Sequence, residues 1–265
     1  MKILITGSHG FVGQAIVKQL APNHELFFFS HSDSLSQIPQ VDAIIHLAGE
    51  NIFGRWTKKK KQRIRESRCD FTEKLVSSLI AQSKIPKHFL SASAVGFYGD
   101  RGDESLTEES AKGEGFLSDV CQCWENASKP LIEKGTRVVH MRFGVILSPN
   151  GGALKKMLLP FKLGLGGRIG SGKQWMSTIQ LTDLLRAIEF LLDQPEITGA
   201  VNLCAPITNL EFSKRIAKSV NHSLGPPLPA FLVKLLFGEM GESLLLASTR
   251  AHPNKILTHG FNFIK

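Results

Sequence analysis

The stretch Lys2-Ile3-Leu4-Ile5-Thr6-Gly7-Ser8-His9-Gly10-Phe11-Val12-Gly13 decides the fold of this chain. Its apolar beginning predicts a short buried strand, and a helical pattern follows from about Phe11 to Leu20. Between the two, Gly7 allows a tight turn, Gly10 lets the backbone approach a ligand, and Gly13 lets the helix pack closely on the strand. We therefore expect a strand–turn–helix unit whose helix N-terminus binds an anion.

The rest of the first half repeats this alternation of apolar runs and helical patterns. The runs predict strands over residues 25–29, 41–47, 87–92 and 137–142, and the patterns predict helices over residues 58–82 and 116–133. Strands that alternate with helices form right-handed βαβ units with parallel strands. The expected fold class is α/β, a Rossmann-type doubly wound parallel sheet.

The composition of the chain changes after residue 150. Residues 163–172 are dense in glycine, and prolines recur from Pro195 to Pro229. We predict a dinucleotide-binding domain over residues 1–150 and a mixed region over residues 151–265. This second region includes a small C-terminal lobe that covers the ligand edge of the sheet, and the chain is free to re-enter the sheet there.

The composition is that of an ordinary globular protein. Of the 265 residues, 42% are hydrophobic and 21% are charged. Apolar runs fall short of the roughly 18 residues of a membrane span, and the apolar start is too short for a signal peptide. We expect a cytoplasmic protein that does not bind membranes. The cysteines show neither Cys-x-x-Cys nor zinc-finger spacing, so we expect reduced thiols: Cys69, Cys121, Cys123 and Cys204.

The net charge of +9 is concentrated in the basic run from Arg55 to Arg68. Such an excess suits nucleic acid, a membrane surface or an anionic small molecule, and a solvated helix face explains the run equally well. Aromatic residues, apart from Trp56, do not alternate with the lysines, so we expect no nucleic-acid binding. A small-molecule substrate remains the favoured partner, and an anionic one is compatible with the charge.

The end of the second predicted strand bears on the choice of dinucleotide. NAD sites usually place an acidic residue there, whereas this strand ends in Ser30 and His31, with Asp33 close by. Hydroxyl and imidazole groups tolerate a 2′-phosphate better than a carboxylate does, so NADP(H) is preferred and NAD(H) stays possible. The expected cofactor contacts follow the first three strands: Thr6, Gly7, Gly10, Phe11, Val12, Gly13, Ser30, His31, Leu47, Ala48, Gly49 and Glu50.

The segment from Thr6 to Gly13, together with His46–Asn51, resembles the extended short-chain dehydrogenase/reductase group, which includes the nucleotide-sugar epimerases. Four further segments resemble its atypical branch of YfcH-like epimerase family proteins: residues 55–68, 91–104, 151–172 and 253–261. The resemblance spans nearly the whole chain. It implies a Rossmann domain, a small substrate lobe and an NADP-type cofactor.

The resemblance also implies catalytic residues, of which one pair is missing. Ser93 matches the family's catalytic serine, but the usual Tyr-x-x-x-Lys pair is replaced by Leu117 and Cys121. In the family, the lysine lowers the pKa of the tyrosine, which then exchanges a proton near neutral pH. Tyr98, the single tyrosine of the chain, either stands in for the missing donor or is a packed aromatic residue.

Four other residues are candidates for substrate contact, namely Asn51, Arg68, Arg142 and Trp175. Arg68 replaces the asparagine that extended relatives carry before the threonine equivalent to Thr72. Two functions stay open. The chain is an NADP-dependent oxidoreductase or epimerase-like enzyme, or it is a cofactor-binding sensor or interaction protein that has lost catalysis.

Overall fold

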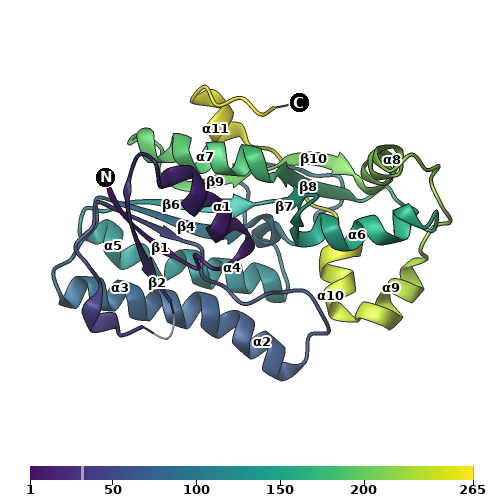
Figure 1. The fold of residues 1–265 in the computed structure, drawn as a ribbon. Coiled ribbons are helices and arrows are strands. Elements are labelled where there is room, and N and C mark those ends of the chain that lie inside the picture. The colour runs from purple at the N-terminus through teal and green to yellow at the C-terminus, as the bar shows by residue number, and fades with distance from the viewer. Residues whose placement is uncertain (31–32, 265) are drawn as a thin grey trace.

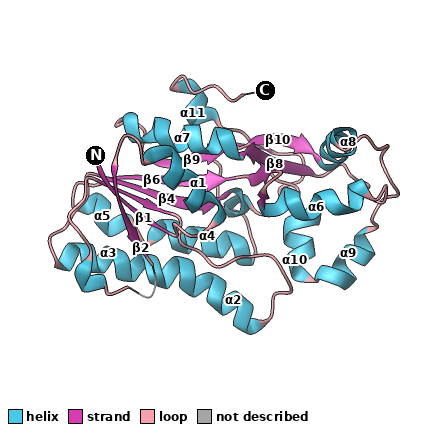
Figure 2. Ribbon diagram, in the orientation of Figure 1, coloured by secondary structure: helices cyan, strands magenta, loops and turns pink. Residues whose placement is uncertain are grey.

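The computed structural model describes residues 1–30 and 33–264, and a parallel sheet lies at its centre (Figures 1 and 2). The sheet has six strands in the described part of the chain, in the order β2-β1-β3-β4-β6-β9. Their bounds are β1 Lys2–Thr6, β2 Glu25–Phe29, β3 Ala43–His46, β4 His88–Ala94, β6 Arg137–Phe143 and β9 Gly199–Leu203. All neighbouring pairs in this sheet are parallel. The predicted Rossmann-type fold is confirmed.

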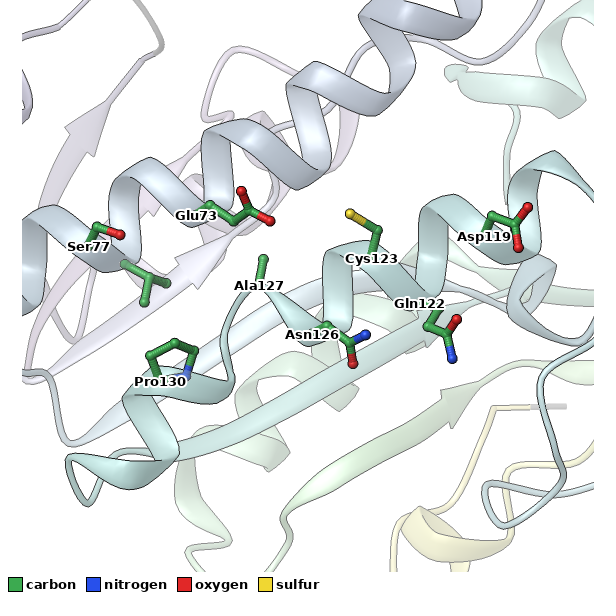
Figure 3. A pocket seen from close by; sticks show the side chains of 9 residues that line it. Glu73, Ser77, Asp119, Gln122, Cys123, Asn126, Ala127 and Pro130 are labelled. Carbon is green, nitrogen blue, oxygen red and sulfur yellow. The ribbon is translucent and has the colours of Figure 1, made fainter.

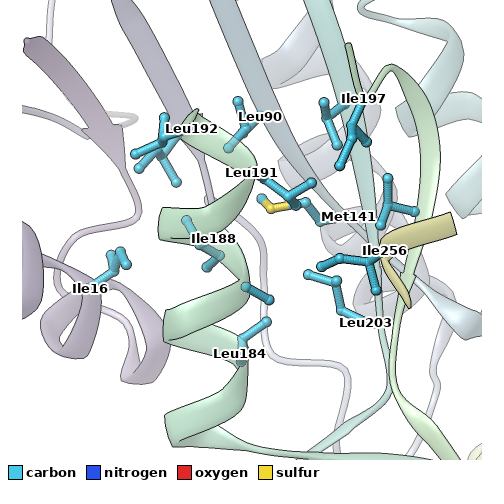
Figure 4. Close-up of a cluster of buried hydrophobic side chains, with 14 of the residues drawn as sticks. Ile16, Leu90, Met141, Leu184, Ile188, Leu191, Leu192, Ile197, Leu203 and Ile256 are labelled. Carbon is cyan, nitrogen blue, oxygen red and sulfur yellow. The ribbon is translucent and has the colours of Figure 1, made fainter. Parts of the chain in front are cut away.

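Both faces of the sheet are buried, as the continuous apolar runs require. Successive side chains of a strand point to opposite faces, so Ile3 and Ile5 of β1 join one core while Leu4 joins the other. Figure 1 shows α1 and α7 on one face and α2 to α5 on the other. In the first core, Leu184, Ile188 and Leu191 of α7 face the strands (Figure 4).

The helices next to the sheet follow the predicted ranges but break at two places. Their bounds are α1 Phe11–Leu20, α2 Lys58–Arg65, α3 Phe71–Ala81, α4 Phe116–Asn126, α5 Lys129–Glu133 and α7 Leu181–Asp193. The helix expected over residues 58–82 contains a π-helical turn, η2, over Glu66–Asp70. The helix expected over residues 116–133 is interrupted at Ser128, just before Pro130, whose ring cannot continue a helix.

The region after residue 143 contributes to both the sheet and a smaller lobe. β9 pairs with β6, so the chain does return to the main sheet. A three-stranded sheet, β10-β8-β7, and several helices form the lobe on the right of Figure 1. Its elements are β7 Val145–Ser148, α6 Gly152–Lys162, β8 Trp175–Gln180, β10 Ala205–Thr208, α8 Asn209–Ser219, α9 Ala230–Phe237, α10 Glu239–Gly241 and η4 Glu242–Leu246.

Short elements complete the connections: η1 Leu35–Gln37, η3 Val95–Tyr98, β5 Ser105–Leu106, β11 Arg250–Ala251 and α11 Asn254–Thr258. The loop predicted over residues 99–115 contains β5, which pairs in parallel with β11 near the C-terminus. Within the described residues, no helix has the length and apolar character that crossing a membrane requires.

The cysteines depart from the expectation of four reduced thiols. The structure joins Cys69 of η2 to Cys123 of α4 in a disulfide, with Cα atoms 5.6 Å apart. Cys121 and Cys204 are free and buried. The prediction is therefore wrong for the first pair. The two residues are 54 positions apart, and it is the packing of η2 against α4 that brings them together.

Candidate dinucleotide cleft and its surroundings

A cleft of about 660 Å³ opens at the carboxyl ends of β1, β2 and β3. Ligands of open α/β sheets bind at this edge, and the volume lies within the range of about 300–1,000 Å³ that is common for small-molecule sites. The lining residues come from the glycine turn, from the ends of β2 and β3, and from α2, η2 and α3. They are Gly7, His9, Gly10, Ser30, Leu47, Ala48, Gly49, Glu50, Arg63, Glu66, Ser67 and Phe71.

The glycines of the turn have different reasons to be glycine. Gly7 has φ +71°, and a Cβ on Gly13 would lie 2.1 Å from the carbonyl oxygen of Gly7, so the fold itself excludes side chains there. Gly10 has φ −72°, which any residue adopts, and a Cβ there would make a tight contact of 3.2 Å with the Gly7 oxygen, which a small backbone shift would relieve. Since neither φ nor a severe overlap excludes a side chain at Gly10, the bare backbone there suits close approach of a ligand to the N-terminus of α1.

Three other expected cofactor residues pack around the turn and do not line the cleft themselves. Thr6 is buried, and its Oγ1 accepts a hydrogen bond from the amide of Ala48 at 3.3 Å. Phe11 begins α1, and its ring packs against the backbone of Gly151 at the start of α6. Val12 packs on the main core. These residues hold the turn in place between β1, β3 and the lobe.

A buried hydrogen-bond chain connects the turn with α3. His46 Nδ1 lies 2.8 Å from Thr6 Oγ1, and His46 Nε2 lies 2.8 Å from Thr72 Oγ1. The Thr72 hydroxyl donates to the carbonyl oxygen of Arg68, so it accepts from Nε2–H, and Nδ1 accepts from Thr6. Burial lowers the pKa of His46 to about 3, which keeps the ring neutral in this tautomer.

The basic run is more than a solvated helix face. Lys60 Nζ lies 2.6 Å from Glu50 Oε1, and this hydrogen bond holds the pKa of the Glu50 carboxyl below its ordinary value. Lys61 reaches across to Glu239 of α10 at 2.6 Å and so connects α2 with the lobe. Lys58 and Lys59 are exposed. The interpretation of residues 58–61 as a purely solvated face is therefore wrong for two of the four lysines.

The end of β2 contributes Ser30 to the cleft. Asp33 folds back over it, since its Oδ2 accepts a hydrogen bond of 2.7 Å from the Ser30 amide. His31, the other residue on which the NADP preference was based, lies outside the described residues. Arg63 is a cationic side chain of the cleft that the sequence did not single out.

The two hydroxyls expected to act in catalysis belong to a closed polar network beneath the ends of β4, β6 and β9. Ser93 Oγ donates to Glu125 Oε1 at 2.7 Å. Arg142 binds both oxygens of the same carboxylate, through Nε at 2.8 Å and Nη2 at 2.9 Å. The Tyr98 hydroxyl accepts from Arg142 Nη1 at 2.9 Å and donates to Asn202 Oδ1 at 2.8 Å. All five side chains are buried.

The electrostatics of this network oppose proton donation by Tyr98. Burial raises its pKa to about 12, and the nearby Arg142 offsets this only in part. Burial alone would lower the pKa of Arg142, but the hydrogen bonds and charge of Glu125 raise it above its ordinary value. Arg142 was expected as a substrate contact, but all three of its guanidinium nitrogens donate hydrogen bonds within the protein. Neither Ser93 nor Tyr98 lines the cleft.

The place of the missing Tyr-x-x-x-Lys pair is apolar. A Cβ on Gly96, just after β4, would lie 3.5 Å from Leu117 Cβ and 4.0 Å from Cys121 Sγ. Burial raises the pKa of the Cys121 thiol to about 11, so it stays protonated. Among the charged groups that act on this thiol, Glu125 of the same helix raises its pKa further, and Arg68, whose Cζ lies 5.1 Å from the centre of the Trp124 ring, opposes this.

The remaining substrate candidates lie in different surroundings. Asn51 is exposed, and its Oδ1 accepts a hydrogen bond from the Phe53 amide. Trp175 begins β8 in the lobe, where its Nε1 donates to Asp103 and Arg250 stacks over its ring at 4.3 Å. Neither lines the cleft.

A second hollow, of about 420 Å³, lies between α3, α4 and α5 (Figure 3). Glu73 and Ser77 border it from α3, and Gln122, Cys123 and Asn126 border it from α4. It contains none of the glycine-turn residues, so it is not the dinucleotide cleft.

Sequence reasoning missed the wall of the cleft that α2, η2 and α3 supply: Arg63, Glu66, Ser67 and Phe71. These residues lie in the predicted long helix. Which of its side chains point into the cleft depends on the π-helical turn between α2 and α3, because the extra residue in that turn rotates one helix relative to the other. Spacing within the sequence does not reveal such a turn, although the replacement of asparagine by Arg68 pointed to this segment.

With the cleft described, comparison with known proteins identifies the group. The model of the NAD dependent epimerase/dehydratase family matches residues 3–204. The chain belongs to this family. The last part of the epimerase-family chain, residues 228–264, also matches a domain of unknown function, DUF1731.

Individual relatives cover nearly all of this epimerase-family chain. Epimerase family protein Mb2239 of Mycobacterium bovis is 38% identical over 281 residues, which is 98% of this chain and 93% of the relative. Epimerase family protein YfhF of Bacillus subtilis is 35% identical, with coverages of 99% and 94%. The crystal structure of the human epimerase family protein SDR39U1, solved with NADPH, is 32% identical and superposes with a TM-score of 0.92, covering 99% of this chain and 95% of its own. The resemblance to the atypical extended short-chain dehydrogenases is confirmed.

Proposed function

We propose that this protein binds NADP(H) in the cleft and is an oxidoreductase or epimerase-like enzyme for a small, anionic substrate. The observation that carries the cofactor assignment is the cleft at the glycine turn. There the bare backbone of Gly10 and the N-terminus of α1 suit a pyrophosphate. The human relative solved with NADPH, with its TM-score of 0.92, supports the same cofactor.

The preference for NADP(H) over NAD(H) rests on Arg63 and Ser30, which line the same cleft. An arginine near the end of the second strand accommodates a 2′-phosphate through charge-assisted hydrogen bonds. Within the described residues, no carboxylate lies within ion-pair distance of Arg63, so its guanidinium is available. Asp33, the acid that would favour NAD(H), instead accepts the Ser30 amide with one of its oxygens.

Fluorescence titration of NADPH and NADH tests this assignment. We expect NADPH to bind at least tenfold more tightly, which corresponds to about 1.4 kcal/mol. Arg63→Met should remove most of this preference while leaving the affinity for NADH unchanged. Arg65→Met, an exposed change on the same helix, is the matched control and should alter neither affinity. Equal or tighter binding of NADH by the unmodified protein would contradict the proposal.

The reaction is proposed from the residues around the cleft. Bound NADPH would supply a hydride to a substrate carbonyl, and the alkoxide formed would take its proton from solvent. The apolar side chains of Leu117 and Cys121 would cover one side of the position where the hydride is transferred. The basic side chains Lys60 and Arg68, which both lower the pKa of Glu50, would attract an anionic substrate.

A second candidate, an NADP(H) sensor without turnover, is favoured by one observation. The hydroxyls of Ser93 and Tyr98 are both used inside the protein, and the Tyr-x-x-x-Lys pair is absent. Hydride exchange between NADPH and a panel of carbonyl compounds and sugar nucleotides separates the two candidates. Turnover of any substrate supports the enzyme, whereas tight NADPH binding without exchange across the panel supports the sensor.

A further inference from the structure

Arg68 lies in the π-helical turn η2, between the end of β3 and α4. Its guanidinium packs against the backbone of Gly49, where an added Cβ would lie 3.1 Å from both Cζ and Nη2. On its other side the guanidinium stacks on Trp124 of α4. Trp124 belongs to α4, the helix that also carries Leu117 and Cys121, the apolar face that replaces the Tyr-x-x-x-Lys pair.

Arg68 is partly exposed, and its guanidinium has few hydrogen-bond partners within the protein. Nη1 donates two long hydrogen bonds, to the Ile64 carbonyl oxygen at 3.3 Å and to Ser67 Oγ at 3.4 Å. In the described ranges, no carboxylate comes within ion-pair distance, and Nη2 has no hydrogen-bond partner. The Glu50 carboxylate, which would be the natural partner, is bound by Lys60. The guanidinium therefore keeps N–H donors and a positive charge that a bound anion would pair through charge-assisted hydrogen bonds.

The position of Arg68 is fixed by the surrounding structure. The hydrogen-bond chain through Thr6, His46 and Thr72 ends on the Arg68 carbonyl oxygen. Burial lowers the pKa of the guanidinium, and the charge of Glu50 acts in the opposite direction. The widened π-helical turn projects this side chain towards β3, and such turns are frequent at functional sites. A site held in this way is pre-organised for a ligand.

Arg68 does not itself line the cleft, but its guanidinium packs against Gly49 and its neighbour in sequence is Ser67, and both of these residues do. The sheet topology tells which end of the cleft lies beside it. A dinucleotide crosses the carboxyl edge from β2, next to its adenosine half, over the glycine turn at β1. Its nicotinamide half then reaches the ends of β3 and β4, where Gly49 and Gly96 lie. Arg68 and the Leu117–Cys121 face border this half, where the substrate has to be held.

We propose that Arg68 binds a carboxylate of the substrate at the nicotinamide end of the cleft. On the free edge of the guanidinium, the Nε–H and one N–H of Nη2 are parallel and match the two oxygens of a carboxylate, which a lysine would bind as a point charge. The substrate class is a small carbonyl or hydroxy compound that carries a carboxylate. Arg68 thereby holds the substrate where the family ordinarily uses a tyrosine and a lysine. This inference rests on the proposed function for the position of the nicotinamide.

Calorimetric titration with oxalate, with its uncharged diamide oxamide as the matched ligand, tests the inference on protein loaded with NADP⁺. We expect oxalate to bind and oxamide to bind at least tenfold more weakly. Arg68→Met should weaken oxalate binding at least tenfold while changing the NADPH affinity less than threefold. Arg68→Lys should retain part of the oxalate affinity, and the exposed Arg65→Met should retain all of it.

Two results would overturn the inference. The first is oxalate binding that is absent, or equal in the unmodified protein and in Arg68→Met. The second is a larger loss of NADPH affinity than of oxalate affinity in Arg68→Met, because the arginine would then serve the cofactor. A thermal unfolding scan of each variant shows whether it is folded. If Arg68→Met does not fold, the oxalate affinity of Arg68→Lys is compared with that of the unmodified protein instead. If NADP(H) fails to bind at all, the proposed function fails, and the same titration on the free protein still decides whether Arg68 binds a carboxylate.

Discussion

The cleft at β1 and the polar network beneath β4, β6 and β9 lie along the same edge of one sheet, but they are built in opposite ways. The cleft is made of backbone: glycines, a helix N-terminus and strand ends leave an open space. The network is made of side chains, and Ser93, Tyr98, Glu125, Arg142 and Asn202 satisfy one another. One region is prepared for a partner from outside, whereas the other is already complete.

This difference separates the part of the fold that forms a cofactor-sized cleft from the part where the family's usual catalytic pair is replaced. The face of α4 that carries a tyrosine and a lysine in relatives here carries Leu117 and Cys121. One turn later the same face presents Glu125, which binds Ser93 and Arg142. The polar groups near the usual catalytic position therefore stabilise the fold, and a new charge, Arg68, enters from the opposite side.

The largest expected effect comes from opening the network. Arg142→Met leaves the buried carboxylate of Glu125 without its counter-charge, and such a change typically costs about 3–5 kcal/mol. We expect urea unfolding to report a loss of stability of this order. The NADPH affinity of the remaining folded protein should change less than twofold, because Arg142 does not line the cleft.

Two further variants test whether the loss of stability comes from the unpaired buried charge. Glu125→Leu combined with Arg142→Met removes both charges and should recover most of the lost stability. Arg215→Met breaks an exposed pair with Glu211, whose atoms are 3.8 Å apart, and should have little effect. If Arg142→Met were as stable as the unmodified protein but bound NADPH much more weakly, the network would belong to the cofactor site.

The same contrast explains what the sequence could predict. The turn from Gly7 to Gly13 is local, since strand, glycines and helix follow one another within a few residues, and its geometry follows from backbone sterics. The sheet around it follows from apolar periodicity. The fold class and the cofactor cleft were therefore accessible without a structure.

The network was not accessible because its contacts join distant parts of the chain. Ser93 and Glu125 are 32 residues apart, Tyr98 and Arg142 are 44 apart, and Tyr98 and Asn202 are 104 apart. A tyrosine after a strand is compatible with catalysis or with packing until these partners are known. The Cys69–Cys123 disulfide and the π-helical turn escaped prediction for the same reason, since both depend on how η2 meets α4.

A substitution in the cleft should affect mainly NADPH affinity, whereas Arg142→Met should affect mainly stability. Gly10→Val introduces a side chain where the backbone is already extended, with φ −72° and ψ 168°, and where the Cβ makes a tight contact of 3.2 Å with the Gly7 oxygen. We expect a small loss of stability from this contact and a fall in NADPH affinity of at least 100-fold, or about 2.7 kcal/mol, because the valine occupies the pyrophosphate position. The NADPH affinity of Gly10→Ala should lie between that of the unmodified protein and that of Gly10→Val. Fluorescence titration measures both variants, and unchanged affinity in Gly10→Val would place the cofactor elsewhere.

The smallest effect concerns His46, which connects the cleft with η2. Its pKa of about 3 in the folded protein lies below the ordinary value of 6.5, so the unfolded chain binds one more proton between these values. Its contribution to stability is present above pH 6.5 and is lost as the pH falls, by about 1.4 kcal/mol per unit. Between pH 6.5 and 5 we expect this histidine to account for a loss of about 2 kcal/mol.

Urea unfolding at pH 7, 6 and 5 measures this dependence, and His46→Gln isolates the contribution of this ring. Burial also lowers the pKa of His140, so the variant should retain a residual slope of the same sign, reduced by about one proton. The amide of glutamine can still bridge Thr6 and Thr72, which keeps the hydrogen-bond chain in place at neutral pH. An unchanged slope in His46→Gln would mean that the histidine accepts a proton in the folded state. The turn and Arg68 would then be connected by a charged group, and binding of NADPH and of oxalate should both respond to pH in that range.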